Sequence, residues 1–166
     1  MDYFLGVDIG GSKSHALIAD AQGQAMGFGQ GGAGNYEVVG WDGLERTLHA
    51  ITAQALDSAN ISKSQIRGAG FGIAGYDWPG EWERTRQAVD SLGVEAAYEI
   101  VNDAIVGLVA GASAGWGVVV VAGTSNNCRG RDRDGREGRV TGCGPVYGEY
   151  GGAVELTAEA VRAVAR

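Results

Sequence analysis

The feature that most restricts the fold is the order of short apolar runs and glycine-rich turns along the N-terminal part of the chain. Three strand-like runs come first, joined by turns at Gly10-Gly11 and at Asp20–Gly23. Two more strand-like runs then alternate with three stretches whose apolar residues recur at helical spacing. The pattern predicts strands at 3–9, 14–20, 24–30, 66–74 and 97–101, and helices at about 44–59, 82–92 and 104–112.

This βββαβαβα order predicts an α/β domain of the ribonuclease H-like class. The first three strands form an antiparallel meander, and the later ones join the same mixed sheet through helical crossovers. We expect this N-terminal domain to span residues 1–115.

After Gly115 the same order of elements begins again. A strand at 117–123, a polar turn, a strand at 127–131 and a third strand near 136–141 follow one another. Ser12 and Ser125 are 113 residues apart, and the turn glycines Gly23 and Gly135 are 112 apart, so the repeat has a nearly constant offset. Only one helix, at 154–165, follows. We therefore expect residues 116–166 to be the start of a second, similar domain in a longer protein.

Composition argues against several classes of protein. The chain has 13 basic and 20 acidic residues and a net charge of −7, which disfavours general nucleic-acid binding. No apolar run approaches the roughly 20 residues of a membrane helix, and the N-terminus lacks the pattern of a signal peptide. Two cysteines do not make a disulfide framework in a chain of this length. We expect a cytoplasmic protein with no nucleic-acid or membrane partner.

Two turns carry groups suited to phosphate. Gly10 and Gly11 let the backbone approach a ligand closely, and Ser12 and Lys13 add donors for phosphate oxygens. Asp8, just before the turn, is placed to hold a hydrated metal ion. The spacing matches neither the dinucleotide-binding motif nor the P-loop. The second set of candidate phosphate ligands is Gly123, Thr124, Ser125 and Asn126.

Turns at matching positions of a repeat could hold the two ends of a triphosphate, with a magnesium ion neutralising its charge. The alternative is two ordinary glycine-rich β-turns. Because the two turns match in position, we favour binding of a triphosphate together with a magnesium ion.

Further polar residues stand at strand ends. Asp103 follows a predicted strand, at the edge where ligands gather in α/β sheets. Asn102 can cap the next helix and leave the Asp103 carboxylate to accept a proton from an attacking hydroxyl group, although either residue could simply be the cap. Gly75 and Asp77 lie in another strand-end loop. Asn35 could bind a polyol or occupy a left-handed turn.

Cys128 and Cys143 flank the second turn region. They could line a pocket, pack as small apolar groups, or ligate an iron–sulfur cluster shared across a homodimer, since four thiolates need two chains.

Together, these motifs resemble those of the N-acetylglucosamine kinase and BadF/BadG/BcrA/BcrD ATPase family, within the sugar kinase, Hsp70 and actin superfamily. The resemblance covers almost the whole chain in order. The segments that carry it are Asp8–Lys13, Gly34-Asn35, Phe71–Gly75, Val101–Ala104 and Ala122–Cys128.

The resemblance implies an actin-like ATPase fold and an ATP-dependent kinase for the 6-hydroxyl of an amino sugar, N-acetylglucosamine or glucosamine. Asp103 would then be the catalytic base, and Asp8 would bind magnesium through water. The substrate-binding candidates are Asn35, Gly75, Asp77, Asn102, Cys128 and Glu149.

The segment 142–152 departs from the family pattern, with Glu149-Tyr150 in place of Asp-Glu, so the identity of the sugar stays open. Two alternatives also stay open. One is an ATPase that activates a CoA-dependent dehydratase or reductase through a dimer-shared cluster, and the other is a non-catalytic sugar or nucleotide sensor. We expect residues 1–166 alone to be poorly active.

Overall fold

The computed structural model describes residues 2–140 and 150–165 and divides into two compact units, Met1–Asp103 and Ala104–Arg166. We describe each unit by itself.

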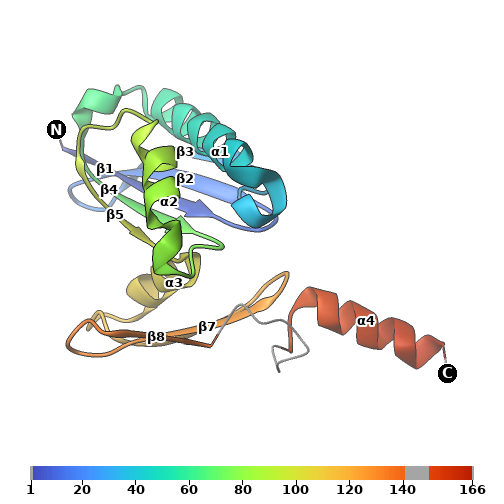
Figure 1. Cartoon of the computed structure of the whole chain (residues 1–166). Helices are drawn as coiled ribbons and strands as arrows, with labels where there is room; N and C mark the ends of the chain where they lie inside the picture. The colour runs from blue at the N-terminus through green and yellow to red at the C-terminus, as the bar shows by residue number, and fades with distance from the viewer. Residues whose placement is uncertain (1, 141–149, 166) are drawn as a thin grey trace. The chain divides into compact units, whose positions relative to one another are not determined.

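The first unit is built on a five-stranded mixed sheet. Its strands stand in the order β3-β2-β1-β4-β5 (Figure 1), with β1–β2 and β2–β3 antiparallel and β1–β4 and β4–β5 parallel. This arrangement confirms the predicted meander and crossovers. The strands are β1 (Tyr3–Ile9), β2 (Ser14–Asp20), β3 (Ala25–Gly31), β4 (Ile66–Ile73) and β5 (Ala97–Val101).

Two helices share one buried core with this sheet. They are α1 (Tyr36–Ala59) and α2 (Trp82–Asp90), accompanied by the short 3₁₀ turns Lys63–Gln65 and Pro79–Glu81. Alternate residues of β1 are buried, as the period of two in a half-buried strand requires. The core includes Leu5, Ile9, Ile18, Leu48, Ile51, Phe71, Val89 and Leu92. On the other face of the sheet, Phe4, Leu17 and Phe28 remain exposed.

The first helix begins eight residues before the predicted start at Leu44. The Asn35 side chain caps it by accepting a hydrogen bond from the Glu37 N–H at 2.9 Å. Asn35 has φ −58°, which excludes the alternative of a left-handed turn at this residue. Gly40, with φ 72° and ψ 169°, interrupts the helix, which explains why the apolar periodicity becomes regular only after it.

Strand β3 passes so close to α1 that glycine is required at Gly29. A Cβ atom placed there would lie 2.0 Å from the backbone oxygen of Ile51. We therefore expect Gly29→Ala to lower the free energy of unfolding by about 1–3 kcal/mol, measured by denaturant titration, because the backbone must shift to admit the methyl group. Gly70→Ala is the matched control, since its Cβ would meet nothing within 4 Å. Equal stability of the two variants would contradict this packing.

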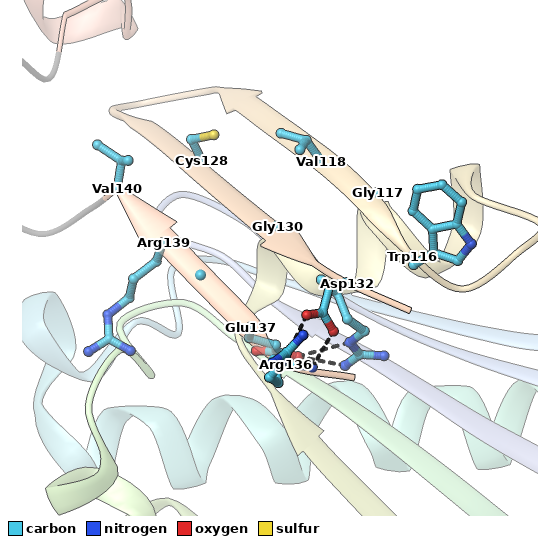
Figure 2. Close-up of a pocket in the computed structure, with 12 residues that line it drawn as sticks. Trp116, Gly117, Val118, Cys128, Gly130, Asp132, Arg136, Glu137, Arg139 and Val140 are labelled. Atoms are coloured by element: carbon cyan, nitrogen blue, oxygen red, sulfur yellow. Dashed lines mark hydrogen bonds and ion pairs between the residues drawn. The ribbon is translucent and has the colours of Figure 1, made fainter. Parts of the chain in front are cut away.

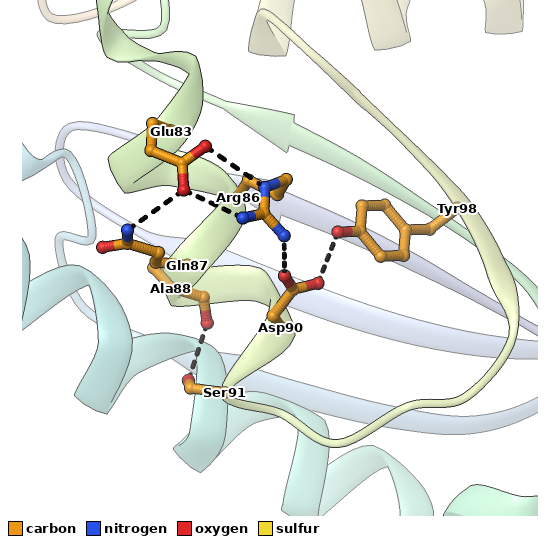
Figure 3. Close-up of polar contacts among 7 residues, drawn as sticks. All are labelled: Glu83, Arg86, Gln87, Ala88, Asp90, Ser91 and Tyr98. Atoms are coloured by element: carbon orange, nitrogen blue, oxygen red, sulfur yellow. Dashed lines mark hydrogen bonds and ion pairs between the residues drawn. The ribbon is translucent and has the colours of Figure 1, made fainter.

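Polar side chains join α2 to the β5 region at the surface. Figure 3 shows Arg86 between Glu83 and Asp90, with N–O distances of 2.9 and 2.5 Å, and Tyr98 donating its hydroxyl hydrogen to Asp90. The hydrogen bonds from Arg86 and Gln87 lower the pKa of the Glu83 carboxyl. These groups are solvated, so they orient the helix more than they stabilise it.

The second unit contains a three-stranded antiparallel sheet in the order β6-β7-β8 and two helices. Its strands are β6 (Gly117–Ala122), β7 (Asn126–Arg131) and β8 (Glu137–Val140), and its helices are α3, which runs from Asp103 to Gly111, and α4 (Ala153–Val164). The predicted third strand extends to residue 141, which lies outside the described residues. Among the described helices, none combines the length and the apolar character needed to cross a membrane.

Candidate functional site

The first predicted phosphate turn is the tight connection between β1 and β2. The Gly10 N–H donates to the Lys13 carbonyl at 3.1 Å and closes the turn. A Cβ atom on Gly10 would lie 2.6 Å from that same carbonyl oxygen, so the turn needs glycine there. Gly11, Ser12 and Lys13 are exposed at the tip. The turn is therefore tight and has an exposed tip, and its binding of phosphate stays a prediction.

Asp8 lies two residues before this turn, opposite His15 in the β1–β2 register. Partial burial of its carboxyl group raises the pKa of Asp8 above the usual value, and the nearby charges of His15 and Lys13 lower it by a smaller amount. The charges of His15 and Lys13 therefore do not offset the loss of solvation at the Asp8 carboxylate, although the residue as a whole is exposed. An added cation would relieve that cost, so the residues present fit a hydrated Mg²⁺ ion.

The end of β1 ties Asn35 to the same turn. The Gly10 carbonyl accepts hydrogen bonds from the N–H groups of Gly34 at 3.0 Å and Asn35 at 3.3 Å. The neighbouring Ile9 carbonyl accepts one from Ala74, just beyond β4, at 2.8 Å. Three loops thus meet at the carboxyl edge of the parallel strands, where α/β sheets bind ligands.

Gly75 lies against Asn35 in this edge. Its φ of +85° and the space around it both demand glycine, because a Cβ atom would come within 2.7 Å of the Asn35 Oδ1 atom. The Tyr36 hydroxyl group donates to the Gly75 carbonyl at 2.6 Å. Asn35 and Gly75, both predicted to bind the substrate, therefore lie side by side.

Asn102 connects the turn at 76–77 to the end of β5. It is 3% exposed, and its amide Nδ2 donates to the Asp77 Oδ1 atom at 3.2 Å and to the Tyr76 carbonyl at 3.4 Å. The next residue, Asp103, is the first of α3 and is partly exposed. Asn102 thus precedes α3 and also donates a hydrogen bond to Asp77. Nothing in the sequence indicated this hydrogen bond.

The second predicted phosphate turn connects β6 and β7. The Gly123 N–H donates to the Ser125 carbonyl at 2.9 Å, and Thr124 and Ser125 are exposed. The turn rests on the start of α4, where Ala153 and Val154 donate to the carbonyls of Gly123 and Thr124 at 2.9 and 3.2 Å.

Gly152 and Asn126 complete that contact. A Cβ atom on Gly152 would lie 2.6 Å from the Ser125 Cα atom, and Asn126 Nδ2 donates to the Tyr150 carbonyl at 3.0 Å. The sequence analysis did not single out Gly152. The Gly151-Gly152 pair directly before a helical pattern was the signal that could have identified it.

Cys128 lies in the middle of β7, opposite Val120 and Val140 in the strand register. Its free thiol is partly buried. With Val118 and Val140 it lines an open hollow of about 620 Å³ over the three strands (Figure 2). Arg131 and Glu137, which also line the hollow, form an ion pair at 2.7 Å. The described residues contain no group of three or more His, Cys, Asp or Glu side chains suited to a metal. Cys143 and Glu149 lie outside the described residues.

The structure brings the predicted residues together as two sets, one in each unit. The set in the second unit is Gly123, Thr124, Ser125 and Asn126. The first unit gathers Gly10, Asn35, Gly75, Asp77 and Asn102 through direct contacts, with Asp8 two residues before Gly10 and Asp103 directly after Asn102. Sequence reasoning missed Tyr36 and Glu81, which also reach this first set.

Two curated relatives match 98% of the chain. The first is the N-acetylmuramic acid/N-acetylglucosamine kinase of Clostridium acetobutylicum, 28% identical over 163 residues, and the second is the N-acetyl-D-glucosamine kinase of Dictyostelium discoideum, 29% identical over 177. The chain spans about half the length of these relatives, 53% and 54% respectively.

Solved structures confirm the fold. A crystal structure from Porphyromonas gingivalis that carries the assignment N-acetylglucosamine kinase superposes with a TM-score of 0.72 at 22% identity, over 97% of this chain and 55% of that one. The inorganic polyphosphate/ATP-glucomannokinase of an Arthrobacter species gives 0.60 at 18% identity, over 85% and 62%. The predicted ribonuclease H-like, actin-like ATPase class is therefore confirmed.

The family assignment rests on nearly the whole chain. The model of the BadF/BadG/BcrA/BcrD ATPase family matches residues 5–166. The segments that carry the motifs, from Asp8–Lys13 to Ala122–Cys128, all fall inside this match. The chain belongs to the BadF/BadG/BcrA/BcrD ATPase family.

Proposed function

We propose that this chain is part of an ATP-dependent kinase that phosphorylates the 6-hydroxyl group of an amino sugar, N-acetylglucosamine or glucosamine. The observation that carries the proposal is the contact of Asn35, Gly75, Asp77 and Asn102 at one edge of the sheet, immediately before Asp103. The names of the two curated relatives, both N-acetylglucosamine kinases, support this choice of substrate class.

The two glycine turns are the proposed phosphate ligands. Ser12, Lys13 and the backbone of Gly10-Gly11 would bind one part of the triphosphate, and residues 123–126 another. Phosphoryl transfer depends mainly on positioning and on neutralising the charge of the phosphate oxygens, which donors of this kind supply. Asp8 would hold Mg²⁺ through water, and the ion would supply further charge neutralisation.

Asp103 is the proposed general base. Its carboxylate would take the proton of the sugar hydroxyl as that oxygen forms a bond to the γ-phosphorus and the bond to ADP breaks. Asn35, Asp77 and Asn102 offer the donors and acceptors that a polyol needs. Cys128 and Glu149 remain proposed sugar contacts from the second unit.

The proposed domain organisation follows the repeat in the sequence. Residues 1–115 would form the first ribonuclease H-like domain, and residues 116–166 would begin a second one. The proposed partners are a small-molecule sugar and ATP, and the proposed compartment is the cytoplasm, where ATP is available.

A substrate panel tests the proposal. The full-length protein is mixed with ATP, Mg²⁺ and N-acetylglucosamine, glucosamine, N-acetylmuramic acid or glucose, ADP release is followed, and the product is examined by phosphorus NMR. We expect the highest kcat/KM with N-acetylglucosamine or glucosamine and a 6-phosphate product. ATP hydrolysis by an iron-containing dimer without sugar phosphorylation would contradict the proposal, as would saturable sugar binding without turnover.

A further inference from the structure

One carboxylate fixes the loop that carries Gly75 and Asp77. A single oxygen of Glu81, Oε2, accepts the backbone N–H groups of both Asp77 and Trp78, each at 2.8 Å. The turn is closed further by the Glu81 N–H, which donates to the Trp78 carbonyl at 3.0 Å. Because two consecutive peptide groups are bound to one atom, the backbone at Asp77 has little freedom to rotate.

The same carboxylate reaches the start of α1. Burial raises the pKa of the Tyr36 phenol well above its usual range, and the nearby Glu81 carboxylate raises it further. Tyr36 directly follows Asn35 and donates its hydroxyl hydrogen to the Gly75 carbonyl at 2.6 Å, so the Glu81 carboxylate lies close to the point where the two loops meet. Tyr36 is itself held by the Trp41 ring, stacked at a centroid distance of 3.9 Å.

Both backbone hydrogen bonds end on a carboxyl oxygen of Glu81. Among the described residues it has no ion pair with lysine or arginine, and it is only partly exposed. Hydrogen bonds to an ionised acceptor are stronger than neutral ones, which suits a carboxylate that holds a loop in place. Glu37 and Asp77 add negative charge near Tyr36, so Glu81 sits among acidic neighbours as well.

We infer that Glu81 is a positioning residue for the acceptor sugar. It does not act on the substrate itself. It holds the backbone of Asp77, whose carboxylate accepts from Asn102, the residue before the proposed base Asp103. Displacement of a bound substrate by about 1 Å can cost about 100-fold in rate, so loss of this support has a large effect. The inference rests on the proposed kinase function.

The test compares Glu81→Ala with Glu81→Gln in the full-length protein. Glutamine keeps an oxygen that can accept both N–H groups, whereas alanine keeps none. We expect the alanine variant to raise KM for the sugar about ten-fold or more while KM for ATP changes less than about two-fold, and the glutamine variant to stay within about three-fold of the native protein. Glu83→Ala, which removes an exposed carboxylate two residues later in the first turn of α2, is the matched control and should change neither constant.

Amide hydrogen exchange gives a second readout that does not depend on turnover. Exchange at Asp77 and Trp78 should become faster in Glu81→Ala and stay slow in Glu81→Gln and Glu83→Ala. Unchanged exchange, or native sugar kinetics, in the alanine variant would overturn the inference. A native protein that phosphorylates no sugar would instead overturn the proposed function, while the exchange data would still decide whether Glu81 holds this loop.

Discussion

Replacement of Asp103 by asparagine is expected to lower kcat of the full-length protein by about 10²–10⁴-fold. Asparagine has nearly the same shape but cannot take the proton of the sugar hydroxyl. The residue is the first of α3 and directly follows the buried Asn102, so its backbone position should survive the change. Steady-state kinetics give kcat, and calorimetric titration gives the Kd of the sugar, which should change little.

A matched control for this variant is Glu99→Gln, which removes an exposed carboxylate from the preceding strand β5. Its kcat should stay within about two-fold of the native value, as expected for a surface position away from the site. Native activity in the Asp103 variant would remove this residue from the mechanism.

Replacement of Asp8 by asparagine is expected to move activity and stability in opposite directions. Activity should fall by about 10²–10³-fold, because the proposed Mg²⁺ site and its charge neutralisation are lost. Stability at neutral pH should rise, because asparagine removes a carboxylate whose charged form the fold disfavours. Such a trade-off is typical of residues kept for function.

The pH dependence follows from the raised pKa of Asp8. The folded protein binds a proton at this carboxyl more tightly than the unfolded chain does, so the group costs stability as pH rises from the ordinary value of 3.8 through the raised one. This loss of stability is complete at neutral pH, and it is absent at pH values below the pKa of Asp8 in both the folded and the unfolded chain. Thermal unfolding of the metal-free protein should therefore show a higher Tm for Asp8→Asn at pH 7 and no difference in acid.

The control for the Asp8 comparison is Asp57→Asn, at an exposed position near the end of α1. Its Tm should match that of the native protein at pH 7. A lower Tm for Asp8→Asn at neutral pH would show that its carboxylate is structural, and the electrostatic explanation would be wrong.

Much of the fold could be predicted because it depends on local patterns. The strand at 97–101 is found with the predicted bounds, and the alternation of buried residues in β1 is visible in the sequence. The start of α1 could not be predicted in the same way. Gly40 breaks the periodicity there, and the Asn35 cap is a polar residue that serves equally well in a turn or a binding loop.

The candidate site was predictable where it lies at strand ends. Strands that run in the same direction bring their carboxyl ends to one edge, so residues after β1, β3, β4 and β5 were expected to meet, and Asn35, Gly75, Asp77 and Asn102 do. Tyr36 and Glu81 were missed because their contacts depend on how the start of α1 packs against a loop about 40 residues later. No spacing in the sequence reports such a contact.

The most direct test is a crystal structure of the full-length protein with a non-hydrolysable ATP analogue, Mg²⁺ and N-acetylglucosamine. We expect the turns at 10–13 and 123–126 both to contact the same triphosphate, and an Asp103 carboxylate oxygen to lie within about 2.6–3.2 Å of the sugar 6-hydroxyl oxygen. Phosphates bound by neither turn, or a sugar hydroxyl beyond hydrogen-bond reach of Asp103, would contradict it.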